Sequence, residues 1–260
     1  MTATLTILGA GTLLPDDGRR SPAFLVEAPG ALVLLDCGPG TLHGLQRHGV
    51  DWRGLTHVAV THYHLDHVGD LAAVLFALKH GIRPSRTRPL TLVGPRGFGT
   101  WLERLAAALG DHVVDPGFDV DVVELGKGDA LEVPAARMRL RAHPTPHTPE
   151  SVAYRLELPV GTVGYTGDTG PSPELAGFLA GCSVLVAECG QADPPGVDTH
   201  LSPAGAAALA EEAAPDLLVL THVFPPLTPH EAVLQVRRAG FGGRVMAGAD
   251  GLRVPVNGGA

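Results

Sequence analysis

Three imidazoles and a carboxylate lie within six consecutive residues of this chain: His62, His64, Asp66 and His67. The segment follows an apolar run at residues 57–61 that predicts a buried strand. The first two histidines are two residues apart in a loop that leaves this strand, so both side chains can face the same side. The carboxylate and the third histidine open the next helical segment. Imidazole together with carboxylate is a ligand set for zinc, manganese or iron.

A single ion can hardly use all four groups of so short a segment without strain, whereas two ions can share them with two ligands each. The alternative is a histidine-rich surface loop without bound metal. A solvated loop, however, gives no reason for four ligand-type residues directly after a buried strand. The segment therefore predicts a site for two divalent metal ions.

Polar residues also follow other predicted strands. His147 lies in a proline-rich turn, Asp168 comes directly after a strand, and His222 follows the apolar run at residues 217–220. The carboxyl ends of buried strands are where α/β sheets place ligand sites. Each residue alone is equally consistent with a structural role. Their common position makes them candidates to complete the two metal sites.

The elements that must position these residues are short. Strands are predicted at residues 4–8, 23–27, 31–36, 57–61, 90–93, 183–188 and 216–221, throughout 119–166, and near 245 and 252. Helical periodicity marks residues 41–48, 68–79, 97–109, 173–180, 203–213 and 229–239. Both halves run from strands into alternating strands and helices, and no low-complexity linker divides them. We predict one α/β domain over residues 1–260, with two mixed sheets packed together and helices outside.

Composition limits the partners. The 260 residues are 45% hydrophobic, enough for a substantial core, and the formal net charge is -8. A protein that only coats nucleic acid should be basic, so general binding of long nucleic acid is disfavoured. One basic stretch leaves two alternatives open, a solvated loop or a patch that faces an anionic substrate. Its residues are Lys79, Arg83, Arg86, Arg88 and Arg96.

The three cysteines, Cys37, Cys182 and Cys189, give an odd, low count without a CxxC motif. This predicts no disulfide framework, and Cys37 is expected to be buried. The first residues carry no basic segment typical of a signal peptide. No apolar stretch approaches the roughly 18 residues that a membrane span needs. The predicted location is the cytoplasm, without membrane contact.

The sequence resembles the metallo-β-lactamase superfamily, and within it the ribonuclease Z-like and phosphodiesterase branch. The resemblance covers nearly the whole chain. It rests on the HxHxDH motif at residues 62–67, on Gly167-Asp168-Thr169, on Thr221-His222, and on an opening with a glycine-rich turn at residues 9–12, Arg20-Ser21 and Leu34-Leu35-Asp36-Cys37-Gly38.

The resemblance implies a fold and a ligand set. The fold is a four-layer αββα sandwich, the metallo-β-lactamase fold, with the site at one edge of the sheets. The implied ligands are His62, His64 and His147 for one metal, Asp66, His67 and His222 for the other, and Asp168 as a bridge between them. Two Zn²⁺ ions are the expected pair, with Mn²⁺ or Fe²⁺ as alternatives.

The resemblance also implies a catalytic pair, Glu188 and His200, for which a purely structural role is the alternative. Two metals roughly 3.5–4 Å apart lower the pKa of a shared water enough to make a bridging hydroxide near neutral pH. Asp66 would orient that hydroxide while it also ligates. His200, held by Glu188, would donate a hydrogen bond or a proton to the leaving oxygen.

Two departures from the family bear on the substrate. True β-lactamases of this superfamily usually carry a cysteine ligand, and none stands in such a position here. Members that process transfer RNA carry a long basic arm, commonly between the equivalents of His147 and Asp168. Here only 20 residues separate these two, and they predict a plain hairpin.

We therefore expect a phosphodiesterase that acts on small anionic substrates, cyclic phosphodiesters included. Small diesters would need only the metals and one or two of Arg83, Arg86 and Arg88. The alternatives are a ribonuclease Z-like RNA endonuclease, a lactone or thioester hydrolase on the same metals, and a metal-stabilised binding protein without activity. A homodimer is compatible with the sequence.

Overall fold

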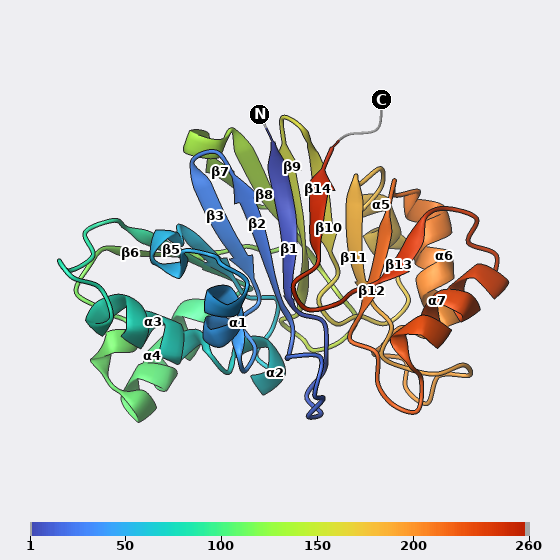
Figure 1. Ribbon diagram of the computed structural model, residues 1–260, viewed down its shortest axis with the longest axis horizontal. Helices are drawn as coiled ribbons and strands as arrows, with labels where there is room; N and C mark the ends of the chain where they lie inside the picture. The colour runs from blue at the N-terminus through green and yellow to red at the C-terminus, as the bar shows by residue number, and fades with distance from the viewer. Residues whose placement is uncertain (1, 258–260) are drawn as a thin grey trace.

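The structure is a computed structural model that describes residues 2–257, in which two seven-stranded β-sheets pack face to face (Figure 1). The first sheet contains, in spatial order, β14 (Arg253–Val256), β1 (Ala3–Gly9), β2 (Ala23–Ala28), β3 (Ala31–Leu35), β4 (His57–Ala59), β5 (Leu90–Gly94) and β6 (Val120–Glu124). The second contains β13 (Val245–Ala247), β12 (Leu218–Thr221), β11 (Val184–Glu188), β10 (Gly161–Tyr165), β9 (Val152–Leu158), β8 (Met138–Pro144) and β7 (Ala130–Val133).

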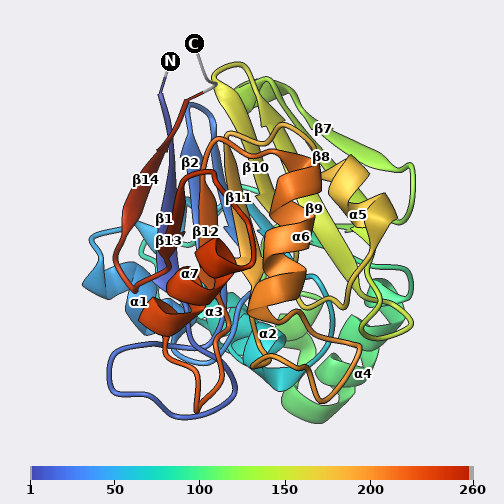
Figure 2. The same ribbon diagram turned by 90° about the vertical axis from the view of Figure 1, so that its right-hand side faces the viewer.

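Helices cover the outer faces of the sheets. They are α1 (Thr41–Arg47), α2 (Leu65–Val68), α3 (Leu71–His80), α4 (Phe98–Leu109), α5 (Pro173–Phe178), α6 (Pro203–Ala213) and α7 (Pro229–Arg238). α1, α3 and α4 pack on the first sheet, whereas α5, α6 and α7 pack on the second (Figure 2). Short 3₁₀ helices at Trp52–Gly54, Asp111–Val113 and Pro134–Ala136 lie in connecting segments.

The strand sequences explain the layers. In β2, Phe24 and Val26 belong to the core between the sheets, whereas Leu25 packs under the helices of the first sheet. Successive side chains of a strand point to opposite faces. Because both faces are covered, the strand is apolar throughout, and full burial of Phe24 alone stabilises the fold by about 2–3 kcal/mol. The predicted four-layer αββα sandwich of the α/β class is confirmed.

Strand direction gathers the predicted ligands at one edge. β3 to β6 pair in parallel, as do β10 to β13. β8 runs in the same direction as β10, because each of them pairs antiparallel with β9. The segments that follow β4, β8, β10 and β12 begin at the carboxyl ends of their strands. The side chains that these segments carry lie close together, so the four ends share one edge of the two sheets. Figure 1 shows α2 at this edge, opposite the start of β1 and the end of β14.

The helix expected at residues 68–79 is confirmed as α3, but it begins three residues later, at Leu71. α2 ends at Val68, and Gly69 and Asp70 separate the two helices. The carboxylate of Asp70 accepts hydrogen bonds of 3.0 and 3.1 Å from the backbone N–H groups of Gly40 and Leu42, at the start of α1. Apolar periodicity continues across the two helices, so it does not reveal a break that serves a different helix.

The interval between His147 and Asp168 contains the predicted hairpin. β9 and β10 pair antiparallel from Leu158 and Gly161 to Tyr154 and Tyr165, with only two residues in the turn. Within residues 2–257, no helix is long and apolar enough to cross a membrane. Cys37 is buried as predicted, and the other two cysteines are also buried and free.

Of the two alternatives for the basic stretch, the structure favours a local role over a patch that faces a substrate. The guanidinium of Arg86 is buried and donates to the carbonyl oxygens of Arg53, Leu55, Arg88 and Pro89 at 2.7–2.9 Å. Those carbonyls precede β4 and β5, at the ends of the strands opposite the predicted ligands.

The neighbouring basic residues make similar local contacts. Arg83 donates to the carbonyl oxygens of His80 and Ile82, and Arg88 donates to that of Gly54. Lys79 donates to the carbonyl oxygen of Asp115, and Arg96 pairs with the carboxylate of Asp129. The basic stretch is therefore structural.

We predict that Arg86→Met lowers the free energy of unfolding by about 2–4 kcal/mol, because buried carbonyl oxygens lose a charged donor. Urea unfolding followed by circular dichroism measures this. Arg88→Met is the matched control, since its exposed guanidinium makes one bond of 3.3 Å, and it should change stability by less than about 0.5 kcal/mol. Hydrolytic activity of the folded Arg86 variant should persist; a specific loss of turnover would contradict a purely structural role.

Candidate metal centre

The structure brings all seven predicted ligands together. The loop between β4 and α2 carries His62 and His64, and α2 itself carries Asp66 and His67. The remaining three follow β8, β10 and β12, and they are His147, Asp168 and His222. Both sheets thus contribute ligands at the shared edge.

A first group of ligand atoms surrounds His64. Its Nδ1 lies 3.1 Å from Nε2 of His62 and 3.1 Å from Nε2 of His147. The Oδ2 of Asp168 lies 3.8 and 3.7 Å from the same two Nε2 atoms. Ligands about 2.1 Å from a tetrahedral ion lie roughly 3.4 Å from one another. The spacing of these four side chains fits one bound ion.

A second group contains Asp66, His67 and His222. The Oδ2 of Asp66 lies 3.3 Å from Nε2 of His222 and 3.9 Å from Nε2 of His67. The carboxylate of Asp168 reaches this group too, because its Oδ1 is 3.3 Å from Nε2 of His67 and its Oδ2 is 3.6 Å from Nε2 of His222. One carboxylate therefore contacts both groups, as a bridge requires.

Unpaired buried atoms support a metal at this place. The Nε2 of His67 and the Oδ1 of Asp168 are buried and have no hydrogen-bond partner of good geometry among the described residues. Leaving such atoms unpaired costs about 1–3 kcal/mol each. A divalent cation between them would remove this cost, so the residues present fit the metals that the fold implies.

The charge states of His62 and Asp168 suit metal binding, whereas His67 would exchange a proton for a metal. Burial lowers the pKa of His67, but the carboxylates of Asp168 and Asp36 outweigh it and raise that pKa well above its usual range. Burial lowers the pKa of His62, and the neighbouring His67 lowers it further. A neutral imidazole is the form that binds a metal. Burial alone would raise the pKa of Asp168, but the adjacent His222 and His67 outweigh it and hold that pKa well below its usual range. Asp168 is therefore an ionised carboxylate.

Asp36, which was not among the predicted site residues, organises the loop between β4 and α2. Asp36 ends the first predicted motif, and its buried carboxylate accepts hydrogen bonds from the backbone N–H and the hydroxyl of Thr61, at 2.7 and 2.9 Å. Its Oδ2 also lies 2.7 Å from Nδ1 of His67 and accepts from the hydroxyl of Tyr165 at 2.6 Å. A carboxylate on the remote nitrogen of a metal-binding histidine fixes its orientation.

The backbone of Asp36 has a φ of 57°, which is uncommon for a residue with a side chain. The sequence signals for its role were its place at the end of a predicted strand and its occurrence in the opening segment Leu34-Leu35-Asp36-Cys37-Gly38, which forms part of the family resemblance.

We predict that Asp36→Asn weakens metal binding by about 10–100-fold, the usual loss for a residue that orients a ligand. The amide keeps the size of the side chain but removes the charge that holds His67. Competition with a chromophoric chelator measures the affinity. Asp51→Asn serves as the control, since its side chain is exposed and bonds only Arg53. Unchanged affinity in the Asp36 variant would show that Asp36 acts on folding alone.

The predicted pair Glu188 and His200 lies beside the cluster. Nδ1 of His200 is 2.8 Å from Oε1 of Glu188. The carboxylate is buried and also accepts from the backbone N–H groups of Thr169 and Gly190, at 2.7 and 2.9 Å. Burial opposes a charge on His200, but the bond to Glu188 outweighs it and raises the pKa of His200. The bond to Glu188 therefore favours the protonated form of the imidazole.

The ring of His200 is 4.7 Å from the ring of His147 and 5.8 Å from that of His222, measured between centroids. Its Nδ1 is engaged by Glu188, so its Nε2 is the atom available to a substrate. One ligand atom of His200 also lies within 4.8 Å of those of Asp168 and His222. The geometry thus permits His200 to act as a ligand, an alternative that the variants discussed below separate from a catalytic role.

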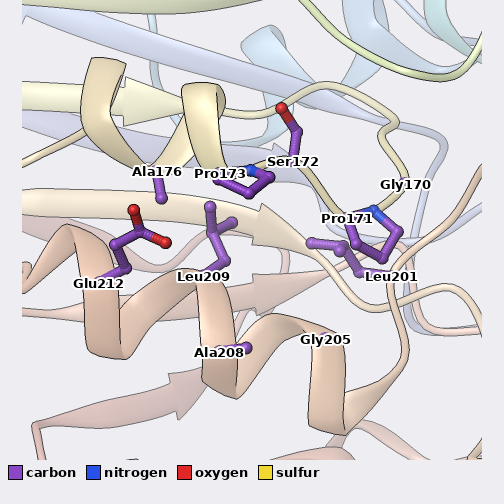
Figure 3. Close-up of a pocket in the computed structure, with 10 residues that line it drawn as sticks. All are labelled: Gly170, Pro171, Ser172, Pro173, Ala176, Leu201, Gly205, Ala208, Leu209 and Glu212. Atoms are coloured by element: carbon purple, nitrogen blue, oxygen red, sulfur yellow. The ribbon is translucent and has the colours of Figure 1, made fainter.

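The segment between Gly190 and His200 forms a groove next to this histidine. Its volume is about 280 Å³, and its lining consists of Pro171, Pro195, Gly196, Val197, Asp198, His200 and Ser202. A separate cavity of about 130 Å³ lies between α5 and α6. Figure 3 shows Leu209 and Glu212 of α6 facing α5 across this cavity, with Gly170 and Pro171 at one end. The cavity has no histidine in its lining and does not belong to the cluster.

His143 and His230, the histidines nearest in sequence to the predicted site elements, lie outside the cluster. His143 pairs with Glu174 at 3.7 Å and contacts the carbonyl oxygen of Pro144. His230 lies in the first turn of α7. Neither belongs to a group of ligand atoms in the described part of the chain.

Comparisons with known proteins agree with this geometry. The sequence profile of a family described as a beta-lactamase superfamily domain matches residues 32–223, which include all seven clustered side chains. A ribonuclease Z of Mycolicibacterium paratuberculosis is 33% identical, over 97% of this chain and 98% of that protein. The metallo-beta-lactamase fold protein YhfI of Bacillus subtilis superposes with a TM-score of 0.84 at 21% identity, over 98% of this chain and 100% of that one.

A diphosphatase of the PhnP family superposes with a TM-score of 0.72 at 20% identity, over 97% of each chain. At such identities the two solved structures support the fold alone. The profile and the ribonuclease Z match extend over most of the chain, and the clustered residues have the chemistry of a metal site. The chain therefore belongs to the beta-lactamase superfamily, among its ribonuclease Z-like metal-dependent hydrolases.

Proposed function

We propose that the protein is a phosphodiesterase with two divalent metal ions that acts on small phosphodiesters, cyclic ones included. The observation that carries the proposal is the pairing of two ligand groups through Asp168, with the Glu188–His200 pair beside them. Phosphodiester cleavage uses such an arrangement, since one part of a site stabilises charge on phosphorus while another assists the leaving oxygen.

The residues that would hold the metals are those of the two groups. His62, His64 and His147 would bind one ion, Asp66, His67 and His222 the other, and Asp168 both. Bound there, two divalent ions would neutralise charge on the phosphoryl oxygens and lower the pKa of a water. Zinc is the expected metal, because imidazole and carboxylate in four-coordinate sites suit it, although Mn²⁺ and Fe²⁺ accept the same ligands.

The protein's own residues would position the substrate and move a proton. Nε2 of His200 would donate to the leaving oxygen as its bond to phosphorus breaks. Glu188 would keep the imidazole protonated and correctly turned, because its two oxygens are themselves fixed by backbone N–H groups. Asp66 would orient the attacking water through Oδ1, since its Oδ2 faces His222.

A small substrate is favoured by what lies around the site. The hairpin of β9 and β10 occupies the interval in which transfer-RNA-processing members commonly carry their arm. The alignment with the mycobacterial ribonuclease Z spans 279 positions against the 260 residues of this chain, so that relative contains insertions. The basic side chains of residues 83–88 face away from the cluster. With a net charge of -8, the protein also repels a long polyanion.

A ribonuclease Z-like endonuclease is the second candidate. It is favoured by the 33% identity to a protein of that name over almost the full length of both chains. Fold and ligands are shared between the two functions, and only the surroundings of the site separate them. The proposed unit in either case is one domain, residues 1–260, because both sheets share one core. Cytoplasmic location and a homodimer remain predictions.

We predict that kcat/KM for an aryl or cyclic phosphodiester exceeds that for a lactone, a β-lactam and a precursor transfer RNA. The test compares all five with metal-loaded protein at physiological salt. Transfer-RNA processing that is efficient and falls steeply with salt would establish the endonuclease instead, because phosphate contacts release counterions. Lactone turnover above every phosphodiester would move the protein to a carbon-ester branch of the superfamily.

A further inference from the structure

Contacts with neighbouring segments hold the ends of the segment that forms the groove beside His200. The carbonyl oxygen of Thr199 lies 3.0 Å from Nδ1 of His147. A Cβ atom at Gly170 would lie only 1.8 Å from the carbonyl oxygen of Asp198, so the backbones of the two segments touch at this glycine. Asp193 accepts from the backbone N–H of Ala204 at the start of α6. Both ends of the segment that forms the groove are therefore anchored to neighbouring segments.

The residues that line the groove are largely apolar and include neither Lys nor Arg. Among the described residues that line it, Pro171, Pro195 and Val197 supply apolar surface, and Asp198 is the one charged residue besides His200. Val197 is 47% exposed, so its side chain is accessible to a bound molecule. Apart from His200, which the proposed reaction uses, a second phosphate or a carboxylate in this groove would find no cationic side chain among these residues.

The groove is also on the leaving-group side of the proposed reaction. His200 forms part of its wall, and Nε2 of His200 is the proposed donor to the leaving oxygen. The group that departs with that oxygen must extend from it, and the groove is the space next to it. A volume of about 280 Å³ admits one ring with a short substituent.

We propose that this groove binds the leaving alcohol and selects one with an uncharged, apolar body, such as an aryl or alkylaryl group. The inference rests on the proposed phosphodiesterase function and names its substrate class. In the reaction, the oxygen of water forms a new bond to phosphorus while the bond to the leaving oxygen breaks. The leaving oxygen takes the proton of His200, and the attacking water returns one proton to the site.

The test uses three methyl aryl phosphates, with phenyl, 4-propylphenyl or 4-(carboxymethyl)phenyl as the aryl group. Their phenols have pKa values near that of tyrosine, about 10, so the intrinsic chemistry is matched. A fully buried methylene is worth about fourfold in binding, and the three partly buried carbons of the propyl group should raise kcat/KM on the order of tenfold. The carboxymethyl ester should fall several-fold below the phenyl ester.

Val197→Lys should reverse this order by placing a cation in the groove, so that the carboxymethyl ester becomes the best of the three. Ratios within each variant are compared, which cancels any change in metal content. Val122→Lys is the matched control, since Val122 is 45% exposed but lies in β6, an edge strand of the other sheet. It should keep the ratios of the unmodified protein.

Three esters cleaved within about twofold of one another, or a preference of the unmodified protein for the carboxymethyl ester, would overturn the groove assignment while leaving the phosphodiesterase function standing. Failure to cleave any of the three, with metals bound, would overturn the proposed function itself, and the groove assignment with it.

Discussion

Asp168→Ala is expected to lose bound metal and hydrolytic activity together. Asp168 is the one carboxylate in contact with both ligand groups, at 3.3 Å from His67 and 3.6 Å from His222 on one side and 3.7 Å from His147 on the other. Without this carboxylate, the positive charges of the two ions would repel each other with no negative charge between them. Activity should fall by on the order of 10³-fold or more, since the metals supply most of the charge stabilisation.

Elemental analysis of purified protein measures the metal. The unmodified chain should contain about two ions, because seven ligand-type residues are too many for one tetrahedral zinc, and Asp168→Ala at most one. Asp168→Asn, which keeps the shape of the side chain, should behave similarly and show that charge is required. Asp129→Ala removes an exposed ion pair with Arg96 and should retain both ions. A stoichiometry of one in the unmodified protein, even after metal is supplied, would contradict the two-metal site.

His200→Ala is expected to keep both metals and to turn over about 10²–10⁴-fold more slowly, the usual contribution of a general acid. The reason is that Nδ1 of His200 is bound to Glu188 while the other ligand atoms form complete groups without it. The loss should shrink for esters with good leaving groups, because such oxygens need little protonation. A series of aryl diesters with phenols of decreasing pKa measures this dependence.

The control is His143→Ala, which removes a histidine that also pairs with a glutamate but lies outside the cluster. It should retain full activity. An equal loss for good and poor leaving groups in His200→Ala would refute the role in proton transfer. Loss of metal from His200→Ala would instead establish His200 as a ligand, which its position near Asp168 and His222 permits.

Much of the fold and of the candidate site could be predicted from sequence because their signals are local. Four ligand types within residues 62–67, and single polar residues after apolar runs, point to the carboxyl ends of parallel strands. Short apolar runs between Gly and Pro residues predicted the strands, and the order of strands and helices, repeated in both halves of the chain, indicated two sheets. These patterns need no knowledge of which segments are neighbours.

What could not be predicted depends on contacts between distant segments. Asp36 acts through His67 and Tyr165, and no spacing in the sequence connects these residues. Arg86 has a side chain of the type that binds anionic substrates. Its guanidinium is nevertheless buried, and it donates to four carbonyl oxygens from two separate loops. Asp70 lies between α2 and α3, and its carboxylate accepts from a backbone N–H at the start of α1. In each case, a polar group satisfies a distant partner, and residue type alone does not reveal that partner.

The origin of the ligands in both sheets has a consequence for stability. Each proposed ion would be held by side chains of the first sheet, such as His64 or His67, and by side chains that enter only later in the chain, such as His147 or His222. An ion bound in this way links two distant parts of the polypeptide, much as a disulfide does. It would restrict the unfolded chain more strongly the longer the loop it closes. Chelation should therefore lower the melting temperature as well as abolish turnover, and the extent of that shift should grow with the free metal concentration that is withdrawn.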